Sequence, residues 1–191
     1  MESSREQATP PVDWEAALVR QAGRGDVLAF ERLYREHAGR VHGLCLRLVR
    51  ESMAAEDCTQ ETFIRAWRSL ARFEARSAFA TWLHRIAVNV VLERRRGPAE
   101  REALAATALS ESDGAAYAEL AVLDTPVEER EIEAAVASLP EGAHDALVLC
   151  GIYGYTHQQA GEMLGVAEGT CKAQLHRARA LLRERLERGG S

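Results

Sequence analysis

Apolar residues in the first half of the chain recur at steps of three and four, which is the spacing of an amphipathic helix. Three such segments predict helices over about residues 26–50, 53–70 and 79–95. Asp26 is suited to cap the first of them, and a Gly-Pro pair follows the third. No segment alternates apolar and polar residues over enough length to make a convincing strand. The pattern therefore predicts an all-α fold.

The rest of the chain divides by composition into a linker and a second helical unit. Residues 98–125 are rich in Ala, Glu and Ser and are expected to form a flexible acidic linker. Further helices are predicted over about 126–138 and 141–153. We therefore expect two small helical domains, 26–97 and 126–188, with residues 1–25 as an N-terminal tail.

The stretch from Thr156 to about Glu187 fits a helix-turn-helix. Thr156 is expected to cap a short helix, Gly165 to end it in the left-handed conformation, and Val166 to plug the turn. Gly161 is a cost inside a helix, unless it lets the two helices approach closely. On the second helix the expected inner face is Cys171, Leu175, Ala178, Leu181, Leu182 and Leu186. Its other face carries Lys172, His176, Arg177, Arg179 and Arg183. Such a helix reads base edges in the major groove, whereas the alternative is a plain hairpin with a solvated basic face.

The net charge of −5 argues against a nucleic-acid partner only until it is divided along the chain. Residues 26–97 carry a net charge of +4 and residues 98–138 a net charge of −8. Residues 139–191 have no net charge, and all six of their basic residues fall between Lys172 and Arg188. The excess negative charge thus gathers around the predicted linker, and the predicted DNA-facing helix is locally basic.

Several classes of protein are excluded or disfavoured. We expect no membrane insertion, because no apolar run is long enough and the N-terminus lacks the order of a signal peptide; we expect a cytoplasmic protein. The four cysteines are expected to be free thiols. Without a phosphate loop, a nucleophile elbow or a paired acid motif, we expect no enzyme, no cofactor and no small-molecule substrate. His42-x-x-Cys45 leaves a zinc protein or thiol sensor as a weak alternative, and we expect no metal.

Two features of the first half suggest binding surfaces. One helix face is acidic and polar, and it carries Asp57, Gln60, Glu61 and Ile64. Such a face suits a partner with basic side chains, although the commoner explanation of the pattern is a face exposed to solvent. Farther on, Phe73 lies in a loop between arginines, and a helix follows that exposes Arg85, Asn89 and Arg96. Arginines, an aromatic ring and an amide together are suited to single-stranded DNA.

With these residues in view, the chain closely resembles the extracytoplasmic-function (ECF) group of bacterial sigma-70-family factors. The segments that carry the resemblance are AEDCTQETFIRAW, FATWLHRIAVN and GTCKAQLHRARALL, in that order. It covers about residues 26–97 and 126–186. The resemblance implies sigma region 2 and sigma region 4 joined by a flexible linker, in a length that leaves no room for the extra domains of housekeeping sigma factors. It also implies that the partners are core RNA polymerase, promoter DNA and an anti-sigma factor.

The resemblance assigns roles by motif position. Asp57, Gln60, Glu61 and Ile64 match the helix that docks on the polymerase clamp. Phe73 and Asn89 match a pocket for a base flipped out of the −10 element. Around that pocket, the flanking −10 DNA would be held by Arg76, Arg85, Arg94, Arg95 and Arg96. Positions that face the −35 element or its phosphates are matched by Thr170, Lys172, Ala173, His176, Arg177, Arg179 and Arg183.

Some positions depart from the family pattern and keep alternatives open. Gln159-Ala160-Gly161 replaces a more usual Glu-Ile-Ala-like triplet, which puts backbone contacts of the first helix in question. His176 is either a pH-sensitive donor to a base or a neutral packed ring. The main rival function is a helix-turn-helix transcriptional regulator that acts without polymerase and does not need the face around Asp57.

Overall fold

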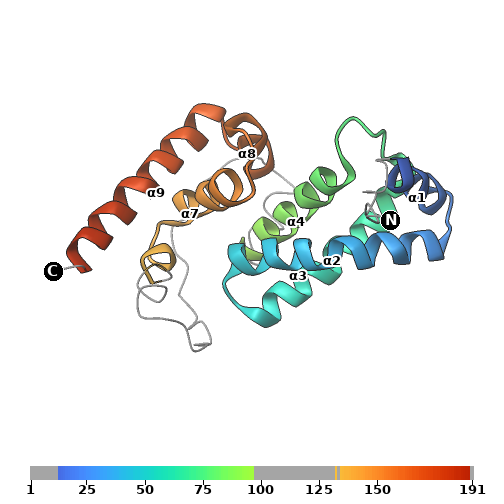
Figure 1. Ribbon diagram of the computed structural model, residues 1–191, viewed down its shortest axis with the longest axis horizontal. Helices are drawn as coiled ribbons and strands as arrows, with labels where there is room; N and C mark the ends of the chain where they lie inside the picture. Colours follow the sequence, from blue (N-terminus) through green and yellow to red (C-terminus); the bar gives the residue numbers. More distant parts are fainter. Residues whose placement is uncertain (1–12, 97–131, 133, 190–191) are drawn as a thin grey trace, which may run out of the picture.

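The computed structural model describes residues 13–96, 132 and 134–189, and all regular structure in these ranges is helical. This confirms the all-α prediction. The N-terminal half (residues 13–96) contains α1 (Asp13–Gly23), α2 (Val27–Val49), α3 (Ser52–Ser69), η1 (Leu70–Arg72) and α4 (Phe79–Arg95). The C-terminal half (residues 132–189) contains α7 (Glu141–Ala146), η2 (Leu147–Ile152), α8 (His157–Leu164) and α9 (Glu168–Gly189) (Figure 1). The linker predicted over 98–125 lies outside the described residues, as does the start of the helix predicted over 126–138.

Local capping explains where α2 and α3 begin. The Asp26 carboxylate accepts hydrogen bonds from the amides of Leu28 and Ala29, at 2.9 and 3.1 Å. Between α2 and α3, Arg50 adopts the left-handed conformation with φ of 60°. The carboxylate of the next residue, Glu51, then accepts from two amides in the first turn of α3. Each cap satisfies backbone donors that have no partner within the helix, so the predicted cap at Asp26 is confirmed.

The N-terminal tail expected over residues 1–25 is wrong for the part that the structure describes. Residues Asp13–Gly23 form α1, which packs on α2 and η1. Its buried residues are Leu18, Val19 and Ala22. They fall on one face at helical spacing, so burying them stabilises the helix against α2. The spacing is present in the sequence, but it extends over only about three helical turns.

The core of the N-terminal half lies between α2, α3 and α4. Leu33, Leu44 and Leu83 are fully buried there. Phe79 is buried in this core and Trp82 is half-buried at its edge. Trp67 of α3 is 37% exposed and packs on Phe30 with 4.9 Å between ring centroids. Its large indole covers the edge of the core instead of entering it.

The helix predicted over 141–153 begins and ends near the expected residues but changes its winding. Pro140 precedes α7, and from Leu147 the helix continues as the π-helix η2. The amide of Tyr153 donates to the carbonyl of Val148 at 3.1 Å, the i+5 spacing of a wider turn. Gly154 then reverses the chain with φ of 72°. Hydrophobic spacing alone does not separate these two kinds of winding.

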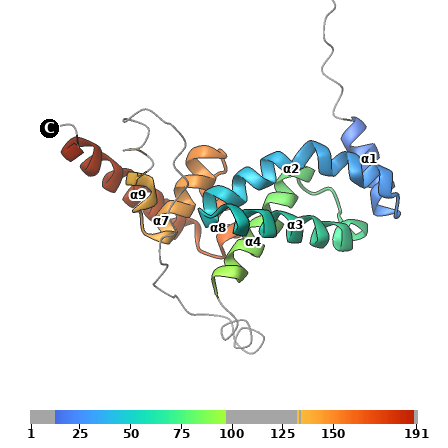
Figure 2. The same cartoon turned by 90° about the horizontal axis from the view of Figure 1, so that it is seen from below.

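The two halves pack against each other. α4 contacts α8, and α2 contacts η2. A single cluster of buried apolar residues runs from the N-terminal half into η2, α8 and the start of α9. In Figures 1 and 2 the C-terminal half lies beside α4 and the C-terminal end of α2.

Candidate nucleic-acid and partner interfaces

α8 and α9 form the predicted helix-turn-helix, and its first helix is held by a reciprocal cap. The Gln159 amide donates to Thr156 Oγ1 at 3.1 Å, and the Thr156 amide donates to Gln159 Oε1 at 3.0 Å. Gly165 ends α8 in the left-handed conformation with φ of 71°. Both predicted signals are therefore confirmed. The unusual glutamine takes the capping place that a glutamate holds in the common motif.

Gly161 lies where the backbone of the turn packs closely against α8. A Cβ atom on Gly161 would lie 2.8 Å from the carbonyl oxygen of Val166, a backbone atom that cannot move aside cheaply. This confirms that glycine permits the close packing of the hairpin. Val166, expected to plug the turn, is 40% exposed. The approaching backbone fills that space, so the valine side chain is left at the surface.

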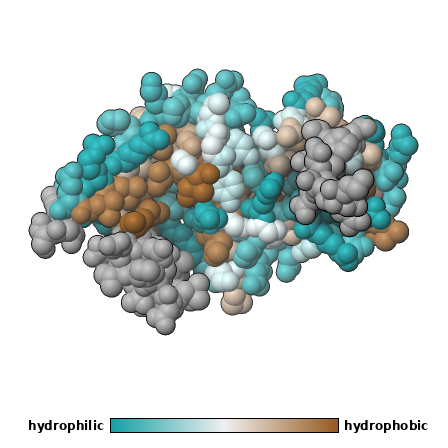
Figure 3. Space-filling model, viewed as in Figure 1, coloured by the Kyte–Doolittle hydropathy of each residue, from teal (hydrophilic) through white to brown (hydrophobic). Residues whose placement is uncertain are grey.

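α9 presents its basic face to solvent. Its buried stripe is Cys171, Leu175 and Ala178, with Leu181 and Leu182 half-buried. The apolar side of the helix is visible beside its hydrophilic edge in Figure 3. Leu186, expected on the inner face, is 43% exposed, because α9 extends past its partners there. All seven positions predicted to face the −35 element are exposed, namely Thr170, Lys172, Ala173, His176, Arg177, Arg179 and Arg183. The exposure of His176 rules out the packed ring in this arrangement.

The acidic face of α3 is accessible, and its carboxylates are paired. Asp57, Gln60 and Ile64 are exposed, and the Glu61 side chain is 40% exposed. Asp57 accepts from Arg94 at 3.2 Å. Arg65 donates to both Glu61 and Glu93, at 2.7 Å each. A groove between α3 and α4 is lined by the paired residues Asp57, Glu61, Arg65, Glu93 and Arg94. The exposed face of α3 therefore combines two carboxylates with the apolar side chain of Ile64. Salt bridges from neighbouring arginines hold the two carboxylates in place.

Of the predicted base-pocket pair, Phe73 precedes α4 and Asn89 lies on it, and they meet that helix at different levels. Phe73 is half-buried against Trp82, with 4.9 Å between ring centroids. Asn89 is exposed and follows Trp82 by seven residues. Seven residues are two helical turns, so Asn89 lies on the same side of α4, about 10 Å farther along its axis. The two residues share one side of the helix and are not brought into direct contact.

The predicted −10 arginines differ in accessibility. Arg76 and Arg96 are exposed, and Arg76 pairs with Glu74 in the loop. Arg94 pairs with Asp57 of the acidic face. Arg85 donates to Glu162 of α8 at 2.6 Å. Two of these side chains are thus occupied by acids of other elements.

Arg95 departs furthest from the prediction. Its side chain is only 20% exposed and donates to both oxygens of Asp145, at 2.6 and 3.1 Å. It also donates to the carbonyl of Leu48 and pairs with Glu141. In this arrangement Arg95 joins the two halves and is not open to DNA.

Asp145 is the buried centre of that junction. Burial alone would raise the pKa of its carboxyl, but hydrogen bonds from His144 and Arg95 bring the pKa below its usual range. His144 accepts from Arg50 through Nε2 at 3.2 Å, and its Nδ1 lies 3.3 Å from Asp145. Burial lowers the pKa of His144, which favours the neutral ring that can bridge the two.

A second buried contact joins the halves at His84. The Tyr155 hydroxyl lies 2.6 Å from His84 Nδ1, and in the tautomer that carries its proton on Nε2 the ring accepts a hydrogen bond from this hydroxyl. Burial is the main reason that the pKa of His84 falls to about 4, with the nearby His37 and Arg40 adding to the effect. The ring is therefore neutral at pH 7, and the hydrogen bond to Tyr155 needs no charge on it.

Sequence reasoning missed the acids that occupy the arginines. Glu141, Asp145 and Glu162 come from the C-terminal half, 46 to 77 residues from the arginines that they meet. Helical spacing carries no signal for contacts across such separations.

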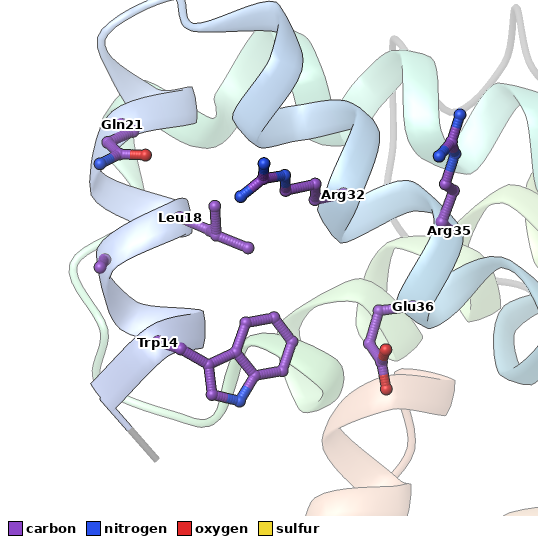
Figure 4. A pocket seen from close by; sticks show the side chains of 7 residues that line it. Trp14, Leu18, Gln21, Arg32, Arg35 and Glu36 are labelled. Atoms are coloured by element: carbon purple, nitrogen blue, oxygen red, sulfur yellow. The ribbon is translucent and has the colours of Figure 1, made fainter. Parts of the chain in front are cut away.

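Other classes of site find little support in the described residues. A hollow between α1 and α2 is lined by mixed polar and apolar side chains, with Trp14 and Arg32 on opposite sides (Figure 4). Within the described ranges, no group of His, Cys, Asp and Glu is placed to hold a metal ion. The helices described there are also too short or too polar to span a bilayer.

Comparison with known proteins places both halves in one family. Residues 33–101 match the model of sigma-70 region 2, and residues 129–182 match that of sigma-70 region 4. ECF RNA polymerase sigma factor SigM of Mycobacterium tuberculosis is 34% identical over 88% of this chain and 82% of its own length. The RNA polymerase sigma-H factor of Pseudomonas aeruginosa is 32% identical over 89% of this chain and 92% of its own. SigE of Mycolicibacterium smegmatis is 36% identical, and the match spans 63% of that longer relative.

Solved structures agree. The sigma factor RpoE of Bartonella quintana, in complex with the anti-sigma factor NepR, has a TM-score of 0.61 and 26% identity. The match covers 84% of this chain and 98% of that one. CnrH, in complex with the cytosolic domain of CnrY, has a TM-score of 0.62 at 24% identity and supports the fold. The chain therefore belongs to the sigma-70 family, among the ECF RNA polymerase sigma factors.

Proposed function

We propose that this sigma factor binds core RNA polymerase, directs it to promoters through −35 and −10 elements, and promotes DNA melting. One observation carries the proposal: the same chain presents a capped helix-turn-helix with an exposed basic helix and, on another element, an exposed acidic face. DNA recognition alone needs only the first of these. The two family models match the chain in the order region 2, then region 4.

The C-terminal half is suited to the −35 element. α9 is long enough to lie in the major groove, where its first turns meet base edges and α8 crosses the backbone. Lys172, His176 and Arg177 supply donors for bases. Arg179 and Arg183 lie farther along the helix and would contact phosphates.

The side of α4 that carries Trp82 and Asn89 is suited to single-stranded −10 DNA. A base leaving the duplex loses stacking worth a few kcal/mol, and contact with a protein ring and amide offsets that loss. Phe73 and Trp82 supply ring surface, and the Asn89 amide can pair with a base edge. Arg76 and Arg96 are exposed to meet the flanking phosphates.

The acidic face of α3 is the proposed polymerase contact. Asp57 and Glu61 would form charge-assisted pairs with basic side chains of the clamp, and Ile64 would bury apolar surface at the centre of the contact. Arg94 and Arg65 would exchange partners when the clamp binds, since both pair with these carboxylates in the free chain.

Further partners and the place of action follow from the same family. Two structural relatives are solved in complexes, one of them with a named anti-sigma factor. We infer that an anti-sigma factor covers surfaces of this chain as well. The proposed role is a non-enzymatic one in the cytoplasm, where RNA polymerase acts.

Transcription in vitro tests the proposal directly. Purified chain and core polymerase are incubated with genomic promoter fragments, with an active sigma factor as a positive control. We expect start sites that depend on the chain, and loss of both polymerase pull-down and transcription in Glu61→Arg. Glu31→Arg, on the exposed surface of α2, is the matched charge control. A chain that binds DNA but retains no polymerase, with Glu61→Arg behaving as wild type, would favour a regulator that acts alone.

A further inference from the structure

Two thiols meet inside the C-terminal half, at a place that the proposed function does not use. Cys150 lies on η2 and Cys171 in the first turn of α9. Their Sγ atoms are 3.8 Å apart, although the residues are 21 positions apart in the chain. Cys171 is buried, whereas Cys150 is half-buried and reaches the surface. The pair thus combines a reachable sulfur with a protected one.

We propose that Cys150 and Cys171 form a reversible disulfide when the protein meets a peroxide. A disulfide has an S–S length of about 2.0 Å, so the sulfurs need to approach by less than 2 Å. Both lie on elements already packed together, because η2 contacts α9. Rotation of the two side chains and small shifts of the helices supply this approach without opening the fold.

The chemistry balances with a peroxide as the two-electron oxidant. The Cys150 thiolate attacks one peroxide oxygen, the O–O bond breaks, and a sulfenic acid forms as water or an alcohol leaves. The Cys171 sulfur, as thiolate, then attacks the sulfenic sulfur, the S–S bond forms and a second water leaves. Overall, two thiols and one peroxide give a disulfide and two molecules of water, or water and an alcohol. A dithiol reductant reverses the change.

Burial assigns the order of the two steps. Desolvation and the neighbouring Cys150 raise the pKa of the Cys171 thiol well above its usual range. Little of it is thiolate at pH 7, and its burial keeps the oxidant away. Cys150 is therefore the sulfur that reacts first, and Cys171 is the one that closes the bond. Since closure requires the Cys171 thiolate, its rate rises with pH.

The other two cysteines provide an internal control. Cys45 and Cys58 lie in the core between α2 and α3, at 0% and 2% exposure. Burial raises the pKa of Cys45 to about 12 and also raises that of Cys58. Neither offers a peroxide a reachable sulfur, so both should remain reduced in the folded protein.

The proposed bond would enclose the first part of the helix-turn-helix. Residues 150–171 contain all of α8 and the turn before α9, and Lys172 follows directly. A link at this position would hold η2 and the first turn of α9 together. Amides of α8 should then exchange hydrogen more slowly in the oxidised protein, because a closed loop restricts local opening.

Peptide mapping tests the proposal in the full chain. The reduced protein is treated with hydrogen peroxide, unfolded in excess N-ethylmaleimide and cleaved after glutamate. Glu162 and Glu168 separate the two cysteines, whereas trypsin finds no site between Arg130 and Lys172. We expect a linked pair of peptides, two hydrogens lighter than their sum, that dithiothreitol separates. Cys45 and Cys58 should be alkylated in the same sample.

Variants separate the outcomes. Cys150→Ser should abolish the linked peptide, and its helical circular dichroism reports that it folds; Cys58→Ser should leave the linkage intact. The proposal is overturned if both Cys150 and Cys171 are alkylated after oxidation. It is equally overturned if Cys150 stops at an oxygen acid while Cys171 stays free, or if Cys45 and Cys58 link at the same dose.

Discussion

At the scale of single residues, contact with backbone decides which small side chain a position accepts. At Gly161 a methyl group would meet the Val166 carbonyl oxygen at 2.8 Å. At Gly169, also helical, nothing lies within 4 Å of the same added atom. Both glycines have a helical backbone, and what an added Cβ would meet differs between them.

We therefore expect Gly161→Ala to lower the stability of the helix-turn-helix. Alanine gains up to about 1 kcal/mol of helix propensity. Overpacking against backbone typically costs about 1–3 kcal/mol, so the net change should be a loss. Urea unfolding followed by circular dichroism measures it. Gly169→Ala is the matched control and should be neutral or stabilising, and a stabilised Gly161→Ala would contradict the contact.

Asn89 provides a test of the proposed melting step. Asn89→Ala removes an exposed amide that would pair only with a base already out of the duplex. We expect promoter opening, measured by permanganate reactivity, to fall by about tenfold, as loss of one such hydrogen bond implies. Binding of holoenzyme to duplex promoter, measured by gel shift, should change little. Equal losses in both assays would refute the assignment of Asn89 to the base pocket.

At the scale of elements, α9 divides its basic residues between functions by helical position. Arg183 lies on the same stripe as Lys172 and His176. Arg185 lies on the opposite flank, although both arginines are exposed. The stripe, and not the total charge of the helix, should therefore determine binding.

The salt dependence of −35 binding tests this division. Arg183→Gln should lower affinity for all sequences alike and reduce the slope of log K against log salt by about 1, as loss of one phosphate contact predicts. Arg185→Gln removes the same charge and should leave the slope nearly unchanged. Fluorescence anisotropy with holoenzyme at several salt concentrations measures both. If the two variants behave alike, only net charge matters and the proposed orientation of α9 fails.

Helical elements were predictable to the extent that their signals are local. The bounds of α4 and the caps at Asp26, Thr156 and Gly165 follow from residues within one or two turns. The π winding of η2 gave no separate pattern. The exposure of Trp67 depends on how α3 meets α2, which the spacing of α3 alone does not specify.

At the scale of the whole molecule, contacts between the halves occupy two arginines that would otherwise face −10 DNA. Arg95 pairs with Asp145, whose side chain is 4% exposed, and Arg85 pairs with Glu162, whose side chain is 47% exposed. Breaking a buried pair leaves an uncompensated charge and typically costs 3–5 kcal/mol. An exposed pair is typically worth about 0–1 kcal/mol.

These magnitudes predict different effects for two conservative changes. Asp145→Asn should separate the halves and increase the radius of gyration measured by small-angle X-ray scattering. Glu162→Gln should leave the radius nearly unchanged. Far-ultraviolet circular dichroism checks that both variants keep their helices. An unchanged radius in Asp145→Asn would show that the apolar contact alone holds the halves together.

Acid should weaken the molecule through His84. Its pKa is about 4 in the folded protein and about 6.5 when unfolded, so between these values the unfolded chain binds more protons. Stability must then fall as pH drops from 6.5 towards 4, by at most a few kcal/mol. In urea unfolding between pH 6.5 and 5, the free energy of unfolding of His84→Gln should fall less steeply with pH than that of the wild type. The difference in slope should correspond to at most one proton. A variant with the wild-type slope would contradict the burial of a neutral His84.

The sequence by itself determined helices α2, α3 and α4, the capped helix-turn-helix, the exposed basic stripe of α9 and the acidic face of α3. These rest on spacing of three or four residues and on caps, and both act within a few turns of one helix. Only the tertiary structure decided that α1 packs on α2, that Arg85 and Arg95 meet acids of the other half, and that Cys150 lies against Cys171. Such contacts join residues from 21 to 77 positions apart or depend on how whole helices pack. Their partners are chosen by burial and charge in three dimensions, which no local pattern of the chain encodes.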